Sequence, residues 1–309
     1  MPNLIDLHCD TLTAGAAGRE LNDPACHLSL DALPREGRWA QMFAIFIPDT
    51  LRGKEAVDYY ERHRRAFLRQ MEDNANRVTF CRSAAELEQA WRQGKTAAWL
   101  SVEGGCVLAG DLDRVALLAE QGVRCITLTW NGENELGSGH DTPHSLTSFG
   151  REAVREMERQ GILVDVSHLN DAGFDDVLAA ASRPFLASHS NARAVCPHRR
   201  NLTDGQIRAM VERECLVGLN YYESFLAPDG HASPEHLLAH IRHFLALGAE
   251  NCLALGSDFD GARLPGWLDS PGKAASLADL LVKEGLGAGA VEKILYANAL
   301  DFLRRTLPG

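Results

Sequence analysis

The sequence predicts an α/β fold of the (β/α)₈ class, a TIM barrel, and three observations indicate it. Short apolar runs rich in strand-forming residues recur along the chain, segments with helical spacing alternate with them, and polar residues stand at the carboxyl ends of several runs. Strands that are apolar on both faces and alternate with helices form parallel sheets, and eight such units suggest closure into a barrel. The runs are 4–8, 41–47, 97–103, 124–130, 162–168, 184–190, 215–221 and 252–258.

Most segments between the runs repeat their apolar residues with the period of an amphipathic helix. Asp111, Thr203 and Ser233 are predicted N-terminal caps, because their side-chain oxygens can accept hydrogen bonds from the free backbone N–H groups of a first turn. The stretch 48–96 is long enough for two helices. The predicted helices cover 56–77, 111–122, 149–161, 171–182, 203–214 and 234–248.

An open, doubly wound parallel sheet is the competing topology. Nucleotide-binding folds of that kind carry glycine motifs, but no G-x-G-x-x-G follows any apolar run and no G-x-x-x-x-G-K-[ST] occurs. The chain also has no linker, repeat or low-complexity stretch that would mark a second folding unit. We therefore expect residues 1–309 to form a single catalytic barrel domain.

Composition narrows the classes of partner. The chain has 31 basic and 42 acidic side chains and a net charge of −11, which disfavours binding to nucleic acid or to an anionic membrane surface. The eight cysteines lie far apart and form no C-x-x-C pair, as expected for thiols in a reducing compartment. No leader-like segment opens the sequence, and no apolar run approaches the roughly 18 residues of a membrane span. A cytoplasmic protein is the expectation.

Polar residues able to bind metal close five of the eight apolar runs. In a barrel the carboxyl ends of all strands meet at one rim, so residues distant in sequence share one pocket there. A single residue of this kind more often makes structural hydrogen bonds or caps a helix, but the joint pattern indicates a metal site. The residues concerned are His8, Asp10, Glu103, His168, His189 and Asp258.

The types of these side chains indicate which metal is bound and how many ions there are. Imidazole and carboxylate ligands without thiolate suit Zn²⁺, with Mn²⁺, Co²⁺ or Fe²⁺ as substitutes. One catalytic zinc ion needs about three protein ligands, whereas this rim offers more, so two ions are expected. Two ions about 3.5–4 Å apart need a bridging group. Every lysine lies outside the strand ends, which leaves Glu103 as the candidate bridge.

Five stretches at the predicted strand ends form a set: HCD (8–10), SVEGG (101–105), VDVSH (164–168), ASHSNARAVCPHRRN (187–201) and GSDFDG (256–261). In type and in order, they resemble the signature motifs of the membrane dipeptidase (renal dipeptidase) family, the zinc peptidases of family M19. The similarity extends over most of the chain. It implies a barrel that hydrolyses the single amide bond of dipeptides.

The resemblance also implies a ligand set for two zinc ions. His8 and Asp10 would bind one ion, His168 and His189 would bind the other, and Glu103 would bridge both. A hydroxide shared by the ions would be the nucleophile, because the metal charges lower the pKa of bound water towards about 7.

The same resemblance implies how a dipeptide is held and cleaved. Arg200 matches the residue that grips the terminal carboxylate, and Tyr222 matches a tyrosine of the pocket. Asp258 matches the aspartate that moves the proton from the attacking water to the leaving amine. L-L dipeptides, and also those with a D-residue at the carboxyl end, are the expected substrates. Relatives of this kind are commonly dimers, which suggests a homodimer.

One position departs from the family pattern. Mammalian members have a histidine after the fourth strand that contacts the substrate near the scissile carbonyl, but Trp130 stands at that place here. Three replacements are open: His140 could reach back from the following loop, Asn131 could supply the polar contact, or the metal ions alone could polarise the carbonyl. His144 is in principle as reachable as His140.

Two other functions are weighed against the dipeptidase. An amidohydrolase-type barrel acting on a non-peptide amide, lactone or ester is disfavoured, because the first run ends in H-x-D instead of H-x-H and no strand-end lysine is present. A barrel that keeps its metal and only binds a partner is expected to have lost a ligand or Asp258, and neither is lost.

Overall fold

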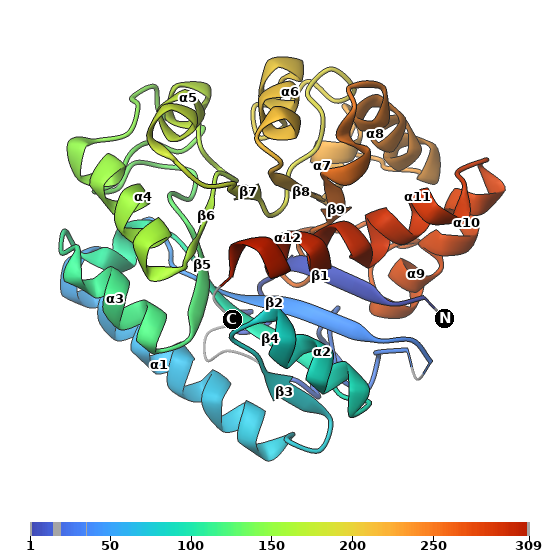
Figure 1. The fold of residues 1–309 in the computed structure, drawn as a ribbon, viewed down its shortest axis with the longest axis horizontal. Helices are drawn as coiled ribbons and strands as arrows, with labels where there is room; N and C mark the ends of the chain where they lie inside the picture. Colours follow the sequence, from blue (N-terminus) through green and yellow to red (C-terminus); the bar gives the residue numbers. More distant parts are fainter. Residues whose placement is uncertain (1, 15–19, 35, 308–309) are drawn as a thin grey trace.

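The computed structural model describes residues 2–14, 20–34 and 36–307, which form a closed barrel of eight parallel strands surrounded by helices (Figure 1). Strands pair in the order β1-β2-β4-β5-β6-β7-β8-β9, and β9 pairs with β1 to close the ring. Each barrel strand overlaps one predicted apolar run, so the predicted (β/α)₈ fold is confirmed. The strands are β1 (Leu4–Cys9), β2 (Trp39–Phe46), β4 (Thr96–Glu103), β5 (Val123–Thr127), β6 (Leu163–Asp165), β7 (Leu186–Ala187), β8 (Leu216–Leu219) and β9 (Leu253–Leu255).

One further strand, β3 (Val78–Phe80), was not predicted. It pairs with residues 96–98 of β4, whereas β5 pairs with β4 only from Leu100 onward. It therefore extends the wall beside the amino end of β4 without entering the ring. Three residues are too few for an apolar period to be recognised in the sequence.

Helices cover the outside of the ring, and two of them lie between β2 and β4 as predicted (Figure 1). Short helices beyond β9 were not predicted. Single helical turns of other types are η1 (Gly105–Leu108), η2 (Ala249–Asn251) and η3 (Lys293–Ala297). The α-helices are α1 (Gly53–Asp73), α2 (Ala84–Arg92), α3 (Asp113–Glu120), α4 (Ser148–Gln160), α5 (Asp171–Ala180), α6 (Asp204–Glu212), α7 (Glu223–Leu226), α8 (Pro234–Ala246), α9 (Pro271–Ala275), α10 (Leu277–Lys283), α11 (Ala288–Glu292) and α12 (Asn298–Thr306).

Two of the three predicted helix caps are confirmed. Thr203 and Ser233 are the N-caps of α6 and α8. The prediction for Asp111 is wrong by one position, because Leu112 caps α3 with backbone angles that are already helical (φ −68°, ψ −28°). Asp111 Oδ1 still accepts a hydrogen bond from the Asp113 N–H at 3.0 Å, so its side chain supports the first turn from one residue further out.

Helix α12 covers the amino-terminal end of the barrel. Asn298 Nδ2 donates to the carbonyls of Glu250 and Leu253 at 2.9 and 2.8 Å, where β9 begins. Phe302 is 1% exposed and belongs to an apolar cluster that includes Leu216 of β8. Apolar packing therefore closes this end, and the polar strand ends lie at the opposite one.

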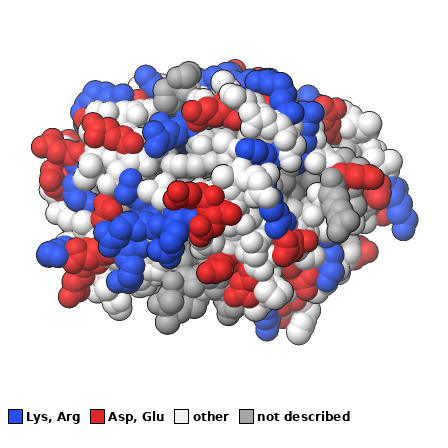
Figure 2. All heavy atoms as spheres, turned by 90° about the horizontal axis from the view of Figure 1, so that it is seen from below, with Lys and Arg blue, Asp and Glu red and all other residues white. Residues whose placement is uncertain are grey.

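The surface carries both signs of charge. Figure 2 shows basic and acidic side chains interspersed on the face formed by α1 and its neighbours. All eight cysteines are buried and form no disulfide. Within residues 2–14, 20–34 and 36–307, none of the helices combines the length and the apolar composition that crossing a bilayer requires.

Candidate metal centre and active site

Six side chains at the carboxyl ends of the strands converge on one region of the barrel. His8 lies in β1 and Glu103 ends β4, while the other four stand just beyond a strand. The ligand atoms of all of them except His168 form two overlapping groups, and within each group all atoms lie within 4.8 Å of one another. The groups are His8, Glu103 and His189, and His8, Asp10 and Asp258.

Unusual backbone turns hold this region. His168 and Asp258 have φ angles of 72° and 64°, in the left-handed region that non-glycine residues seldom occupy. The ends of β1 and β9 are also interlocked, because the Asp258 N–H donates to the His8 carbonyl at 3.2 Å and the Asp10 N–H donates to the Phe259 carbonyl at 2.8 Å. These two bonds keep Asp10 and Asp258 next to each other.

Glu103 stands between two sets of possible ligands. Its Oε1 lies 2.8 Å from His168 Nε2 and 3.7 Å from His189 Nε2. Its Oε2 lies 3.5 Å from His8 Nε2, which in turn lies 3.3 Å from Asp10 Oδ2. The two oxygens of one carboxylate therefore face different imidazoles, which is the arrangement that a bridging ligand needs.

Hydrogen bonds determine which nitrogen of each imidazole is free. His168 Nδ1 lies 2.8 Å from the acceptor Asn131 Oδ1, so Nδ1 carries the proton. His189 Nδ1 lies 2.7 Å from Ser188 Oγ, whose own proton is donated to Asp165 Oδ2 at 2.6 Å. Both Nε2 atoms are therefore acceptors, although they lie only 2.9 Å apart. Two lone pairs at that distance need a cation between them, and the donor set fits zinc.

The electrostatics of the carboxylates also favour a cation. Burial raises the pKa of Asp10 to about 7 against the attraction of His8, with help from the charge of Glu103. Burial likewise raises the pKa of Asp258. It acts on Glu103 in the same direction, but His8 and His168 outweigh it and hold the pKa of Glu103 well below its usual value. A divalent cation would relieve the repulsion among these acids.

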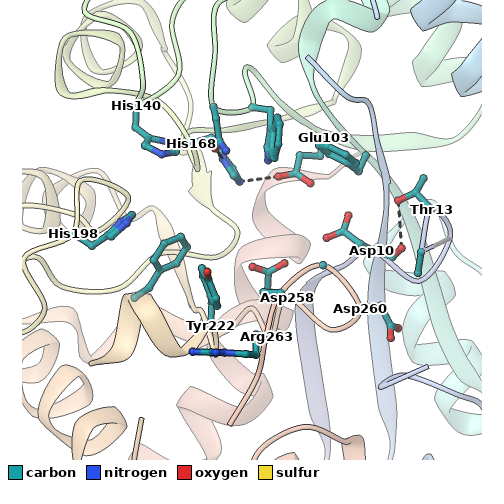
Figure 3. A pocket seen from close by; sticks show the side chains of 17 residues that line it. Asp10, Thr13, Glu103, His140, His168, His198, Tyr222, Asp258, Asp260 and Arg263 are labelled. Atoms are coloured by element: carbon teal, nitrogen blue, oxygen red, sulfur yellow. Dashed lines mark hydrogen bonds and ion pairs between the residues drawn. The ribbon is translucent and has the colours of Figure 1, made fainter. Parts of the chain in front are cut away.

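The possible ligands open onto a pocket of about 680 Å³, a volume suited to a small molecule. Figure 3 shows Glu103, His168 and Asp258 facing the same space, with His198 on one side of it and Asp10 on the other. A bound molecule would therefore lie directly against the converging strand ends.

Arg200 is a buried cation beside this pocket. It is 4% exposed, its Nη2 donates to the His189 carbonyl at 3.4 Å, and its guanidinium lies 5.3 Å from the ring of Phe225. Among the described residues it has no carboxylate within ion-pair distance, and its Nε has no hydrogen-bond partner. Burial lowers the pKa of Arg200 to about 10, so it stays charged at neutral pH. Within the part of the chain that the structure describes, Arg200 is therefore not held by a salt bridge.

The candidate replacements for the family histidine both line the pocket, as does Trp130. The oxygen of Asn131 is engaged by His168. His140 has its ring 6.2 Å from the ring of His168, and its buried Nδ1 has no partner among the residues that the structure describes. Burial lowers the pKa of His140 to about 3, with a further contribution from Arg200, so the ring is neutral. His140 is thus the replacement with a free polar atom.

The remaining candidates lie in different environments. Tyr222 lines the pocket, with its ring edge-on to Phe225 at 4.7 Å. His144 is exposed, is bonded to Glu133, and is not among the residues that line the pocket. The structure therefore places Tyr222 within reach of a bound molecule and His144 outside it.

The sequence reasoning missed the groups that hold the predicted ligands. Ser188 and Asp165 orient His189, and Asn220 Nδ2 donates to Asp258 Oδ2 at 3.0 Å. A signal was present, because VDVSH and ASHS place an aspartate and serines inside otherwise apolar strands. Buried polar side chains need partners, and a strand-end histidine is the partner at hand.

Comparison with known proteins agrees with this geometry. The family model "Membrane dipeptidase (Peptidase family M19)" matches residues 2–306. A metallopeptidase from Rhodobacter sphaeroides, solved with a phosphinate mimic of the dipeptide L-Ala-D-Ala, has a TM-score of 0.91 at 29% identity, covering 98% of this chain and 99% of that one. A solved M19 metallopeptidase called dipeptidase AC has a TM-score of 0.92 at 29% identity, covering 99% of both chains.

A comparison of sequences adds a further relative. The "Uncharacterized protein in pqqA 5'region" of Klebsiella pneumoniae is 34% identical over 253 residues, which are 77% of this chain and 93% of that protein. The family model covers almost the whole chain, and the two solved structures share the fold from end to end. The chain therefore belongs to the membrane dipeptidase family, peptidase family M19, and is a metallo-dipeptidase.

Proposed function

We propose that the protein is a binuclear zinc dipeptidase in which Glu103 bridges the metal ions. The observation that carries this proposal is the placement of Glu103, whose Oε1 lies 2.8 Å from His168 Nε2 and whose Oε2 lies 3.5 Å from His8 Nε2. His8 and Asp10 would complete one site, and His168 and His189 the other. When bound, the two ions would make a water nucleophilic at neutral pH and polarise the scissile carbonyl.

Asp258 is the proposed proton carrier. It lines the pocket, and Asn220 holds its Oδ2, which leaves Oδ1 for a reacting group. Burial raises its pKa, and a carboxyl group with a raised pKa takes up and releases a proton more readily near neutral pH. Asp258 would accept a proton from the attacking water and return it to the leaving amine.

Arg200 is the proposed clamp for the terminal carboxylate. A buried guanidinium without an anionic partner gains strongly from a carboxylate, which it can hold by two parallel hydrogen bonds. Fixing the terminus sets its distance from the metal ligands, so that only the adjacent amide bond lies in place. Tyr222 and His140, which line the pocket beside Arg200, would contact the bound dipeptide.

The proposed substrates are L-L dipeptides and dipeptides with a D-residue at the carboxyl end. Support for the second group comes from the similar Rhodobacter sphaeroides metallopeptidase, which was solved with a mimic of L-Ala-D-Ala. The test is metal analysis of the purified protein together with a panel of L-L dipeptides, L-D dipeptides, lactones and paraoxon. Two zinc ions per chain and hydrolysis of dipeptides alone are expected, and turnover only of lactones or paraoxon would overturn the proposal.

The clamp has its own test. Arg200→Ala should lower kcat/KM by about 10² or more on free dipeptides, the scale of a lost charge-assisted contact, and have little effect on C-terminally amidated ones. Arg208→Ala, at an exposed position of α6, is the matched control. Equal losses on free and amidated substrates would show that Arg200 does not bind the carboxylate.

A further inference from the structure

We propose that Phe46 and Trp130 form an apolar wall, here called the Phe46–Trp130 wall, that selects dipeptides with a bulky apolar side chain on the amino-terminal residue. This inference rests on the proposed function, because it takes the dipeptide to be held by its carboxylate at Arg200. It adds a substrate class to that function and assigns a role to Trp130, which departs from the pattern of the mammalian family members.

The wall is built next to the possible metal ligands. Phe46 ends β2 and is paired in register with Glu103, and Trp130 follows β5. The two rings pack edge-to-face, with centroids 4.9 Å apart and planes at 68°. The Trp130 ring also lies 6.4 Å from that of His168. Both side chains line the pocket and are only partly buried, so part of their apolar surface faces the space that a substrate would fill.

Barrel topology places the wall across from the carboxylate clamp. Phe46 ends β2 and Trp130 follows β5, and these two strands flank β4. Arg200 follows β7 and packs on Phe225, which follows β8. In a ring of eight strands β8 lies opposite β4, because three strands separate the two in either direction. Possible metal ligands border both groups, because Glu103 pairs in register with Phe46 and Arg200 Nη2 donates to the His189 carbonyl.

This arrangement orients a dipeptide. If Arg200 holds the carboxylate and the scissile bond lies at the metal ligands, the carboxyl-terminal residue occupies the side of Tyr222 and Phe225. The amino-terminal residue then extends to the opposite side, where its side chain meets Phe46 and Trp130. An aliphatic or aromatic side chain there buries apolar surface of the substrate and of the wall, whereas glycine leaves the apolar surface of the wall exposed to water.

The test compares two matched series of dipeptides on the metal-loaded protein. One series varies the amino-terminal residue (Gly-Ala, Ala-Ala, Leu-Ala, Phe-Ala), and the other varies the carboxyl-terminal residue (Ala-Gly, Ala-Leu, Ala-Phe). We expect kcat/KM for Leu-Ala and Phe-Ala to exceed that for Gly-Ala by about 10-fold or more, the range that one apolar pocket can discriminate.

Variants assign that preference to the wall. Trp130→Ala should bring the ratio of Leu-Ala to Gly-Ala close to one and leave the ratios within the carboxyl-terminal series and the metal content unchanged. Trp130→Phe and Phe46→Leu should keep part of the preference, and they serve as the test if Trp130→Ala does not fold. Trp267→Phe is the control, because Trp267 Nε1 bonds to the Ala232 carbonyl and the residue does not line the pocket.

The outcomes separate the two proposals. An amino-terminal preference that stays at the wild-type level in both Trp130→Ala and Phe46→Leu, or a change confined to the carboxyl-terminal series, would overturn the wall while the dipeptidase proposal stands. The wall is also overturned if wild-type protein cleaves Gly-Ala as well as Leu-Ala. No hydrolysis of any dipeptide by the two-zinc protein would overturn the proposed function, and the wall with it.

Discussion

The two ends of the barrel are built from the same strands and differ in almost every other respect. At the amino-terminal end, α12 lays Phe302 on an apolar cluster and satisfies strand carbonyls through Asn298. At the carboxyl-terminal end, some buried polar atoms have no partner within the described part of the chain, among them Asp10 Oδ1 and Arg200 Nε. Two imidazole lone pairs also face each other there at 2.9 Å. One end is built mainly from apolar packing, and the other gathers polar groups that bound ligands would pair.

The difference shows how one end of a barrel can supply stability while the other end supplies the chemistry. Burying polar groups without partners costs free energy, so the carboxyl-terminal end is stabilised only when cations and an anion fill it. The amino-terminal end supplies packing that does not depend on any ligand. Substitutions at the two ends should therefore affect different measurable properties.

The largest expected effect is at the bridge. Glu103→Gln keeps the size of the side chain but removes a charge that faces both His8 and His168. We expect at most one metal ion per chain and no measurable turnover, because the attacking water and the carbonyl both depend on the paired ions. Metal analysis by mass spectrometry and a dipeptide assay check this.

Glu158→Gln is the matched control, since Glu158 is a buried carboxylate that bonds Ser182 away from the site. It should retain the metal content and turnover of the wild type. Two ions and full activity in Glu103→Gln would refute the bridging role.

The second-largest effect is expected at the amino-terminal end of the barrel. Phe302→Ala should lower the free energy of unfolding by about 3–5 kcal/mol, because it removes a fully buried aromatic side chain and leaves a cavity. Denaturation curves measure the loss, and kcat/KM per folded molecule should stay within a factor of about two at low temperature. A loss of bound metal in this variant would show that the two ends are coupled.

Asp258→Asn should lower kcat by about 10² or more, the scale of a general acid–base contribution, while the metal content is unchanged. Asparagine is a suitable probe, because it tolerates the left-handed backbone that Asp258 adopts (φ 64°). Steady-state kinetics with parallel metal analysis would check it. Loss of metal would mean that Asp258 acts as a ligand and not as the proton carrier.

The smallest effect is expected from the serine behind His189. Ser188→Ala removes the acceptor that fixes the protonated ring nitrogen, and partners of this kind typically contribute 10–100-fold to metal affinity. Chelator competition should show a loss of about that size. Ser101→Ala, which removes a buried hydroxyl bonded to the Phe43 carbonyl, should show none. If Ser188→Ala binds metal with wild-type affinity, the hydrogen bond between Ser188 and His189 does not orient His189 for metal binding.

Most of the fold could be predicted because its signals are local. Apolar runs and helical spacing predicted all eight barrel strands, and the polar strand ends predicted where the site lies. The strands β6, β7 and β9 are shorter than the runs predicted, because the chain turns out of the sheet before His168, His189 and Asp258. Strand β3 and the short helices after β9 were missed, since segments of three to seven residues carry too little pattern.

The sequence predicted that the site residues lie close together, but it did not predict which other side chains bond to them or pack on them. The bond from Asp165 through Ser188 to His189 joins two strands, and the stacking of Arg200 on Phe225 joins a loop to helix α7. Such contacts depend on distances across the barrel, which no spacing along the chain encodes. The sequence also left His140 and Asn131 as equal alternatives, and only the geometry distinguishes them.

The left-handed backbone of His168 and Asp258 bears on protein engineering. Each residue holds a conformation that costs an ordinary side chain about 1–2 kcal/mol, and glycine would adopt it freely. Glycine at either position would remove a group on which the chemistry depends. A variant library ranked only by heat resistance should therefore accumulate inactive molecules at these two positions, and turnover has to be scored alongside.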